Sequence, residues 1–350
     1  MNRITNFSKS IELRKKSHAL IPGGAHTYSK GDDQFPYLAP SFITHAKGCH
    51  IWDPDGNEFI DYGMGLRSVI LGHAYDEVDN AVIEQIRKGT NYTRPSLLEM
   101  ELAEKMKEII PCAEMSKFAK NGSTVTTAAV KLARAYTGRD YVICCKEHPF
   151  LSYDDWFIGT TPCYSGIPET IRNLTLTFNY NNIESLQKLF DEYHNKVACV
   201  IFEPVSLEEP RDNFLQKVKE LCSKNGAIFI LDEMVTGFRY GLGGAQKHYN
   251  IIPDMATFGK SMANGYSLAA LCGKKDIMEI GGIYSKHDRV FLVSTTHGAE
   301  NQVLTAGLKT MEIIGRDKVT EKNLESTDKL RNGFNELITA HKLNDYLNVI

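Results

Sequence analysis

The stretch AIFILDE, residues 227–233, has the pattern of a buried strand that ends in two acidic residues. Five consecutive apolar residues are typical of a strand covered on both faces, because an exposed face would need alternating polar residues. Similar runs are YVICC (141–145), ACVIFEPV (198–205) and LAALCG (268–273), and amphipathic helical segments lie between them. Strands that alternate with helices predict an α/β fold, with a mostly parallel sheet sandwiched by helices.

Three polar residues follow these strands where they end. Asp232 lies at the end of AIFILDE, and Glu203 lies near the end of ACVIFEPV. Lys260 comes directly after a further strand segment, DMATFG. Active groups of such sheets gather beyond the carboxyl ends of the strands. A buried Asp232 needs a cationic or N–H partner, which a protonated ring nitrogen or a nearby Lys or Arg would supply.

Lys260 lies in PDMATFGKSMANG, residues 253–265, where small residues leave room around it. An amine in a confined, desolvated place has a lowered pKa and can attack an aldehyde. The alternative interpretation is an ordinary surface lysine.

The segment Asn121-Gly122-Ser123-Thr124 precedes a clear helix. Free backbone N–H groups at a helix start, with a glycine that permits close approach, predict a phosphate site. The alternative is a simple capping turn that stabilises the helix start.

Composition excludes several classes of protein. The formal net charge of −3 and the pI near 6.4 argue against a nucleic-acid or anionic-membrane surface. Neither an apolar run of about 20 residues nor a secretory signal is found in the sequence. The eight cysteines have no metal-site spacing, which predicts reduced thiols, no metal and a cytoplasmic location. GLGGA (241–245) lacks the spacing of a dinucleotide-binding loop.

Helical spacing predicts helices over 8–20, 75–89 and 96–110 and two more from about 303, and residues 50–62 predict a hairpin. We expect residues 1–65 to be the N-terminal segment of a small domain and 66–315 the large cofactor-binding domain. Residues 316–350 would begin the C-terminal part of the small domain. The last residues, DYLNVI, have the pattern of a strand, so that part is expected to be incomplete.

A phosphate-binding helix start, a strand-end aspartate and a lysine after the next strand form the arrangement that holds pyridoxal 5'-phosphate. The sequence resembles the class III aminotransferases of fold type I from about residue 18 to the end. It is most similar to glutamate-1-semialdehyde aminomutases and to related sugar-modifying enzymes of surface-polysaccharide pathways. The resemblance rests on IPGGAHTYSKG, GCHIWDPDGNEFIDY, LGHAYDEV, FAKNGSTVTTAAVKLARAYTGRD, IFEPV, LDEMVTGFR, PDMATFGKSMANGY and STTHGAENQ.

The resemblance implies roles for individual residues. Lys260 forms the covalent bond with the cofactor aldehyde and then moves the substrate proton, and Asp232 keeps the ring nitrogen protonated. Gly122 and Ser123 match the phosphate loop, with Thr124 as a third contact.

Other residues are expected to surround the cofactor, among them Glu203. Met234 would cover one face of its ring. Alignment on DDWFIG places Phe150 on the other face, whereas an alignment with one gap places His148 there. Ordinary core packing is the alternative for Met234 and Phe150.

The resemblance also implies a homodimer with shared active sites. Thr296 matches a threonine that reaches the partner subunit's phosphate, and Thr295 takes this place if the alignment shifts by one residue.

Departures from the family bear on the substrate. Lys30 stands where the aminomutases have a carboxylate-binding arginine, and lysine cannot offer the same bidentate contact. Arg67 and Arg94 could meet a phosphate or a nucleotide-sugar diphosphate, or could lie at the surface or the dimer interface.

The expected activity is transfer of an amino group from an amino acid to an aldehyde or ketone, with a sugar as one possible acceptor. The alternative is intramolecular transfer by an aminomutase. A catalytically silent binding protein is the third hypothesis, and the presence of both Lys260 and Asp232 argues against it.

Overall fold

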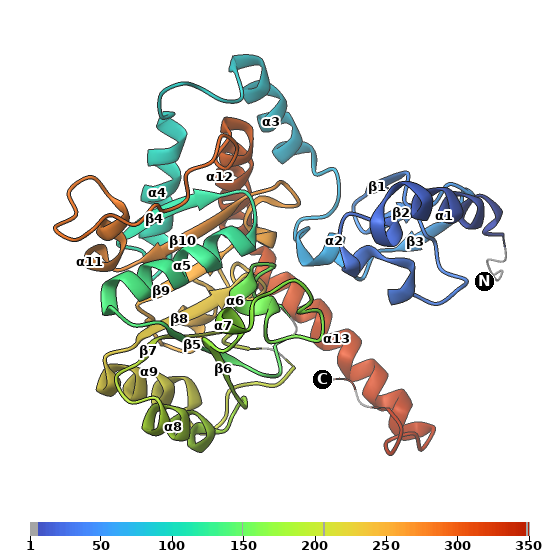
Figure 1. The fold of residues 1–350 in the computed structure, drawn as a ribbon. Helices are drawn as coiled ribbons and strands as arrows, with labels where there is room; N and C mark the ends of the chain where they lie inside the picture. Colours follow the sequence, from blue (N-terminus) through green and yellow to red (C-terminus); the bar gives the residue numbers. More distant parts are fainter. Residues whose placement is uncertain (1–5, 149, 206, 348, 350) are drawn as a thin grey trace.

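A seven-stranded sheet forms the centre of the large body of the molecule (Figure 1). The computed structural model describes residues 6–148, 150–205, 207–347 and 349. The strand order is β4-β10-β9-β8-β7-β5-β6. The strands are β4 (Met115–Ala119), β5 (Tyr141–Cys145), β6 (Thr175–Phe178), β7 (Val197–Phe202), β8 (Ile228–Glu233), β9 (Met255–Phe258) and β10 (Ala269–Gly273).

The sheet is largely parallel, as predicted. Strands β9, β8, β7, β5 and β6 pair in parallel, whereas β10 runs antiparallel to both of its neighbours, β9 and β4. The central strands β7 and β8 are buried at every position. Their continuous apolar runs therefore reflect helices on both faces of the sheet.

The two faces of the sheet are covered by different helices. Ile201 and Ile230 belong to a core cluster with α5 (Gly122–Thr137). Phe202 and Leu231, one residue further along each strand, pack with α8 (Ile183–Glu192) and α9 (Phe214–Asn225). A third cluster lies under α3 (Asp76–Lys88), α4 (Leu97–Ile109) and α12 (Asn301–Arg316). This alternation decides which helices each strand-end side chain faces.

The N-terminal residues form a separate lobe, joined to the body through α2 (Met64–Arg67) (Figure 1). This lobe contains α1 (Ser8–Leu20) and an antiparallel sheet of β1 (His45–Lys47), β2 (His50–Trp52) and β3 (Glu58–Ile60). The helix over 8–20 and the hairpin over 50–62 are confirmed.

The remaining helices are α6 (Asp155–Ile158), α7 (Glu169–Arg172), α10 (Gly244–His248), α11 (Lys275–Met278) and α13 (Val319–Ala340).

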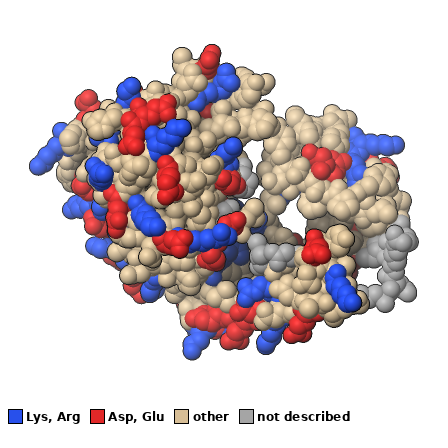
Figure 2. Space-filling model, turned by 90° about the horizontal axis from the view of Figure 1, so that it is seen from below, with Lys and Arg blue, Asp and Glu red and all other residues tan. Residues whose placement is uncertain are grey.

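Helix α13 projects from the body, and the chain turns back beyond it (Figure 1). The strand expected over DYLNVI is wrong for its described residues, 345–347 and 349, which form a turn and irregular chain. Figure 2 shows acidic and basic side chains interspersed over the face that it draws. Every helix within the described residues is too short or too polar to cross a bilayer.

Candidate active site

Three neighbouring parallel strands bring Glu203, Asp232 and Lys260 to one edge of the sheet. Glu203 follows β7, Asp232 is the last residue but one of β8, and Lys260 follows β9 by two residues. Because β7, β8 and β9 are adjacent, their carboxyl ends meet. The same edge receives the loop after β4, from which α5 begins, and the loop after β5, which carries His148.

Asp232 is buried on the α5 side of the sheet, since it lies two residues after Ile230. Its Oδ1 accepts hydrogen bonds from Thr257 Oγ1 (2.8 Å) and from the backbone N–H of Met234 (3.0 Å). Among the described residues no hydrogen bond reaches Oδ2. Burial raises the pKa of Asp232 to about 6, while the hydrogen bond from Thr257 and the charge of Lys260 oppose this effect.

Lys260 opens a tight turn, Lys260–Ala263, whose other three residues are buried. Its φ of 43° is in the left-handed region, a strained conformation that persists where the surroundings impose it. Lys120 and Lys274 pair with carboxylates, whereas Lys260 has no ion-pair partner in the part of the chain that the structure describes. Burial lowers the pKa of Lys260, although Asp232 and Glu203 oppose this effect. The site therefore holds a partly desolvated amine with a free Nζ.

Glu203 and His148 form a buried pair beside these residues. The backbone N–H of Glu203 donates to His148 Nδ1 (3.1 Å), and the ring stacks on Phe202. Burial, and then the nearby Asp232, raise the pKa of Glu203 to about 7, while burial lowers the pKa of His148 to about 4. His148 Nε2 is buried without a hydrogen-bond partner among the described residues.

The start of α5 faces the same edge of the sheet. Asn121 caps the helix by accepting from the N–H of Thr124, and Ser123 Oγ accepts from the N–H of Tyr153 (3.0 Å). The N–H groups of Gly122 and Ser123 precede the first internal hydrogen bond of the helix, so they are free for an anion.

Met234 lies between two glycines, Gly122 and Gly259. A Cβ atom at Gly122 would come within 2.9 Å of the Met234 sulfur, and one at Gly259 within 2.7 Å. The two glycines therefore leave room for the buried Met234 side chain, which would have to shift if either residue carried a Cβ atom.

The other predicted contacts are more exposed. The Phe150 ring is 53% exposed and meets Phe157 edge to face. Thr295 Oγ1 is engaged with the carbonyl of His297, whereas no hydrogen bond engages the Thr296 side chain among the described residues. This difference favours Thr296 over Thr295 as the side chain available to a partner.

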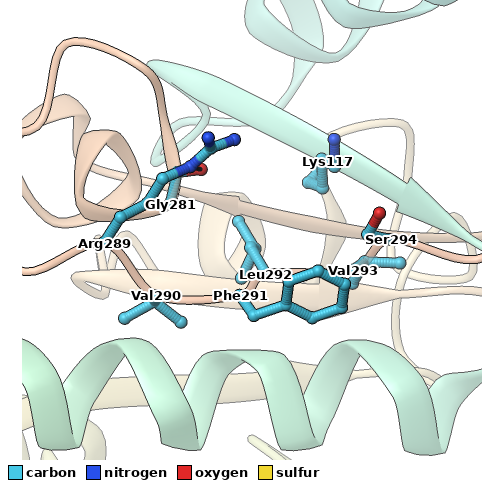
Figure 3. A pocket seen from close by; sticks show the side chains of 8 residues that line it. All are labelled: Lys117, Gly281, Arg289, Val290, Phe291, Leu292, Val293 and Ser294. Atoms are coloured by element: carbon cyan, nitrogen blue, oxygen red, sulfur yellow. Dashed lines mark hydrogen bonds between the residues drawn. The ribbon is translucent and has the colours of Figure 1, made fainter.

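A segment that runs alongside β4 leads to Thr296. With Lys117 and Gly281, residues 289–294 line a cavity of about 240 Å³ (Figure 3). Phe291 is 77% exposed there.

Two site residues were not recognised from the sequence. Arg239 lies in the quoted motif LDEMVTGFR, and its Nη2 donates to the backbone carbonyl of Arg67. Asn264 accepts from the N–H groups of Ile70 and Leu71 and donates to the carbonyl of Gly72. The sequence did contain one indication of Arg239, namely its position shortly after the strand that carries Asp232.

Lys30 and Arg94 are both exposed. Lys30 is exposed and lines a cavity of about 730 Å³ within the N-terminal lobe. Arg94 is exposed on the loop whose Asn91 donates to the Thr296 carbonyl. No group of three or more potential ligand side chains in the described residues could hold a metal ion.

The arrangement fits a flat, anionic, aldehyde-bearing ring. A free amine, a buried carboxyl with an unpartnered oxygen and a helix start with free N–H groups surround the Met234 side chain, which a flat ring could contact. Such a group would supply a cationic N–H for Asp232 Oδ2 and the anion that α5 favours.

Comparisons with known proteins agree with this chemistry. A family model described as "Aminotransferase class-III" matches residues 28–346. The chain is 34% identical to a 3-aminobutyryl-CoA aminotransferase of Cloacimonas acidaminovorans, over 90% of this chain and 75% of that protein. It is also 34% identical to a glutamate-1-semialdehyde 2,1-aminomutase of Francisella philomiragia, over 97% of this chain and 80% of the relative.

A solved structure shows the same fold. The PLP internal aldimine form of the FumI protein of Sphingopyxis sp. MTA144 superposes with a TM-score of 0.88 and is 28% identical. The match covers 96% of this chain and 80% of that one.

Proposed function

The chain belongs to the class III aminotransferases, which use pyridoxal 5'-phosphate, and from this premise we propose that it moves an amino group from an amino acid to an aldehyde or ketone. The observation that carries the proposal is the partly buried, unpaired Lys260 beside Asp232 at the ends of adjacent strands. A silent binding protein would have no use for a strained, desolvated lysine at this place.

Pyridoxal phosphate supplies an aldehyde that condenses with amines and a ring that withdraws electrons from the attached carbon. Lys260 Nζ would hold the cofactor and would move the proton to and from the reacting carbon of the substrate. Asp232 would keep the ring nitrogen protonated through Oδ2, while Thr257 and the Met234 N–H hold Oδ1 in place.

The remaining cofactor contacts follow from the same placement. Gly122, Ser123 and Thr124 bind the phosphate at the start of α5, where the helix dipole favours negative charge. Met234 covers one face of the ring and Phe150 the other, with His148 as the alternative. The exposed ring of Phe150 supports its availability for such a contact.

Glu203 is proposed to contact the cofactor as an acid that is protonated in part near neutral pH. Its pKa of about 7 is well above that of an ordinary glutamate because it is buried beside Asp232. A carboxyl that keeps its proton can donate a hydrogen bond to an oxygen of the ring.

The functional unit is proposed to be a homodimer in which Thr296 of each subunit reaches the phosphate held by its partner. The free hydroxyl of Thr296 and the exposed Phe291 nearby support this assembly. Sedimentation of the full chain should give the mass of a dimer, and a monomer at micromolar concentration would contradict the proposal.

The eight free cysteines support a location in the cytoplasm.

Borohydride reduction tests the assignment of the covalent site. The chain loaded with pyridoxal phosphate should be yellow, and reduction should fix the cofactor to the peptide that contains Lys260. Peptide mass spectrometry gives the labelled residue. A label on another lysine, or on none, would refute the proposed function.

Intramolecular transfer is the second candidate, because a relative that is 34% identical is named as an aminomutase. Lys30, in the N-terminal lobe, does not reproduce the bidentate arginine that the family resemblance places there. Kinetics with and without a separate amino donor would distinguish the two reactions.

A further inference from the structure

One buried carboxylate joins the threonine loop, residues 295–300, to the start of α5. Glu300 is 6% exposed. Its Oε1 accepts a hydrogen bond from Lys120 Nζ (2.8 Å), and its Oε2 accepts from the backbone N–H of Gly298 (3.1 Å). Lys120 directly precedes Asn121, whose side chain caps α5. A single ion pair therefore connects the threonine loop to the residue next to the phosphate-binding helix start.

The burial of Glu300 distinguishes this ion pair from an ordinary surface contact. A more exposed pair such as Lys309–Glu312 contributes little to stability, because water and salt screen it. Burial alone would raise the pKa of Glu300, but the hydrogen bond and the charge of Lys120 outweigh that effect and lower the pKa below its ordinary value. The carboxylate is therefore ionised at neutral pH, and removal of Lys120 would leave a buried charge without its cation.

The threonine loop is also held from its other side, by residues 89–91. Asn91 Nδ2 donates to the backbone carbonyl of Thr296 (3.0 Å). Asn301, which follows the loop, donates its backbone N–H and its side-chain amide to the carbonyls of residues 90 and 89. The main chain of the loop is therefore fixed on both sides, whereas no hydrogen bond engages the Thr296 hydroxyl among the described residues.

We propose that Lys120 and Glu300 are positioning residues, whose ion pair holds the threonine loop where Thr296 reaches the cofactor phosphate of the partner subunit. The inference rests on the proposed function and adds two residues that act through Thr296. In a symmetric dimer the same ion pair of the partner serves the phosphate of this subunit. Loss of the ion pair should therefore weaken recognition of the phosphate and leave the cofactor ring and aldehyde unaffected.

The affinity for the cofactor, measured with and without its phosphate, tests this inference independently of turnover. Absorbance titration of the full chain, freed of cofactor, gives one Kd for pyridoxal phosphate and another for pyridoxal, which lacks the phosphate. Glu300→Gln should weaken binding of pyridoxal phosphate about 10-fold or more, as for loss of a hydrogen bond to a charged group. The Kd of pyridoxal should stay within about 2-fold, because that compound offers no phosphate to Thr296.

Variants of Lys120 provide a second measurement, because this side chain is half-exposed and its replacement leaves the core intact. Lys120→Met should weaken binding of pyridoxal phosphate as Glu300→Gln does, whereas Lys120→Arg keeps the charge and should retain most of the affinity. Lys309→Ala breaks the more exposed ion pair on α12 and is the matched control, which should bind both compounds as the unmodified chain does.

A combination with Thr296→Ala shows whether the ion pair acts through Thr296. Glu300→Gln should add less than about 2-fold to the loss caused by Thr296→Ala, because both substitutions remove the same contact. Additive losses, no loss in Thr296→Ala, or equal weakening of pyridoxal phosphate and pyridoxal would overturn the inference. Full affinity in Glu300→Gln would do so too, and would indicate that Lys120 meets the phosphate directly. A borohydride label at Lys260 would still support the proposed function in each of these cases.

Discussion

Replacing Lys260 with alanine is expected to lower the rate of amino transfer by about 10²–10⁴-fold, because the chain loses its proton-moving base. Asp232 cannot replace it, since its Oδ1 is engaged with Thr257 and the Met234 N–H. Stopped-flow absorbance with the best donor found for the unmodified chain would give the rate. Added methylamine should restore part of it if the missing function is proton transfer.

The variant should keep its fold and its affinity for pyridoxamine phosphate, which makes no covalent bond with the chain. The start of α5 and Asp232 remain in place, and alanine keeps a side chain at the strained φ of 43°. Lys274→Ala is the matched control, because that lysine is exposed and pairs with Asp254. Retention of more than about a tenth of the rate in Lys260→Ala would remove Lys260 from the mechanism.

The central strands could be predicted from sequence because both of their faces are buried. The run YVICC coincides with β5, and AIFILDE gives β8 to within one residue. The edge strands β4 and β6 were missed, since the exposed Lys117 and the alternation TLTF interrupt their apolar runs. The direction of β10 could not be predicted from the sequence either, because a buried strand has the same apolar pattern whichever way it runs.

The site residues that lie at the ends of strands could be predicted from the sequence. Asp232 and Lys260 each lie at or just after such an end, so the parallel sheet brings them together without further information. Arg239 depends instead on a contact with Arg67 across 172 residues, and Asn264 binds Ile70 across 194. Contacts of that kind depend on how the N-terminal lobe joins the body, which no local pattern specifies.

The chemistry of the site is therefore divided between two parts of the chain. The sheet edge supplies the amine and the acid, and its pattern can be recognised in the sequence. The left-handed turn at Met64–Arg67 lies beside the Lys260 turn, because Asn264 binds the backbone that follows it and Ser261 donates to the Arg67 carbonyl.

Asp232→Asn is expected to lower the rate of amino transfer by about 10²–10⁴-fold, since each ~1.4 kcal/mol lost from transition-state stabilisation is a tenfold change. Asparagine can keep both hydrogen bonds at Oδ1, from Thr257 and from the Met234 N–H. Its amide in the place of Oδ2 would donate rather than accept, and it carries no negative charge. The ring nitrogen would therefore lose the partner that keeps it protonated. Single-turnover absorbance with a fixed donor measures the rate.

The same substitution should not destabilise the chain without cofactor, which separates an electrostatic role from a structural one. Burial raises the pKa of Asp232 to about 6 from an ordinary value of 3.8. The stability associated with the protonated carboxyl is complete below pH 3.8 and is lost as the pH rises through about 6, a cost of roughly 3 kcal/mol. The neutral asparagine side chain would avoid this cost, so at about pH 8 the cofactor-free Asp232→Asn variant should melt at the same temperature as the unmodified chain or higher. A lower melting temperature with an unchanged rate would show that Asp232 supports the fold and not the reaction.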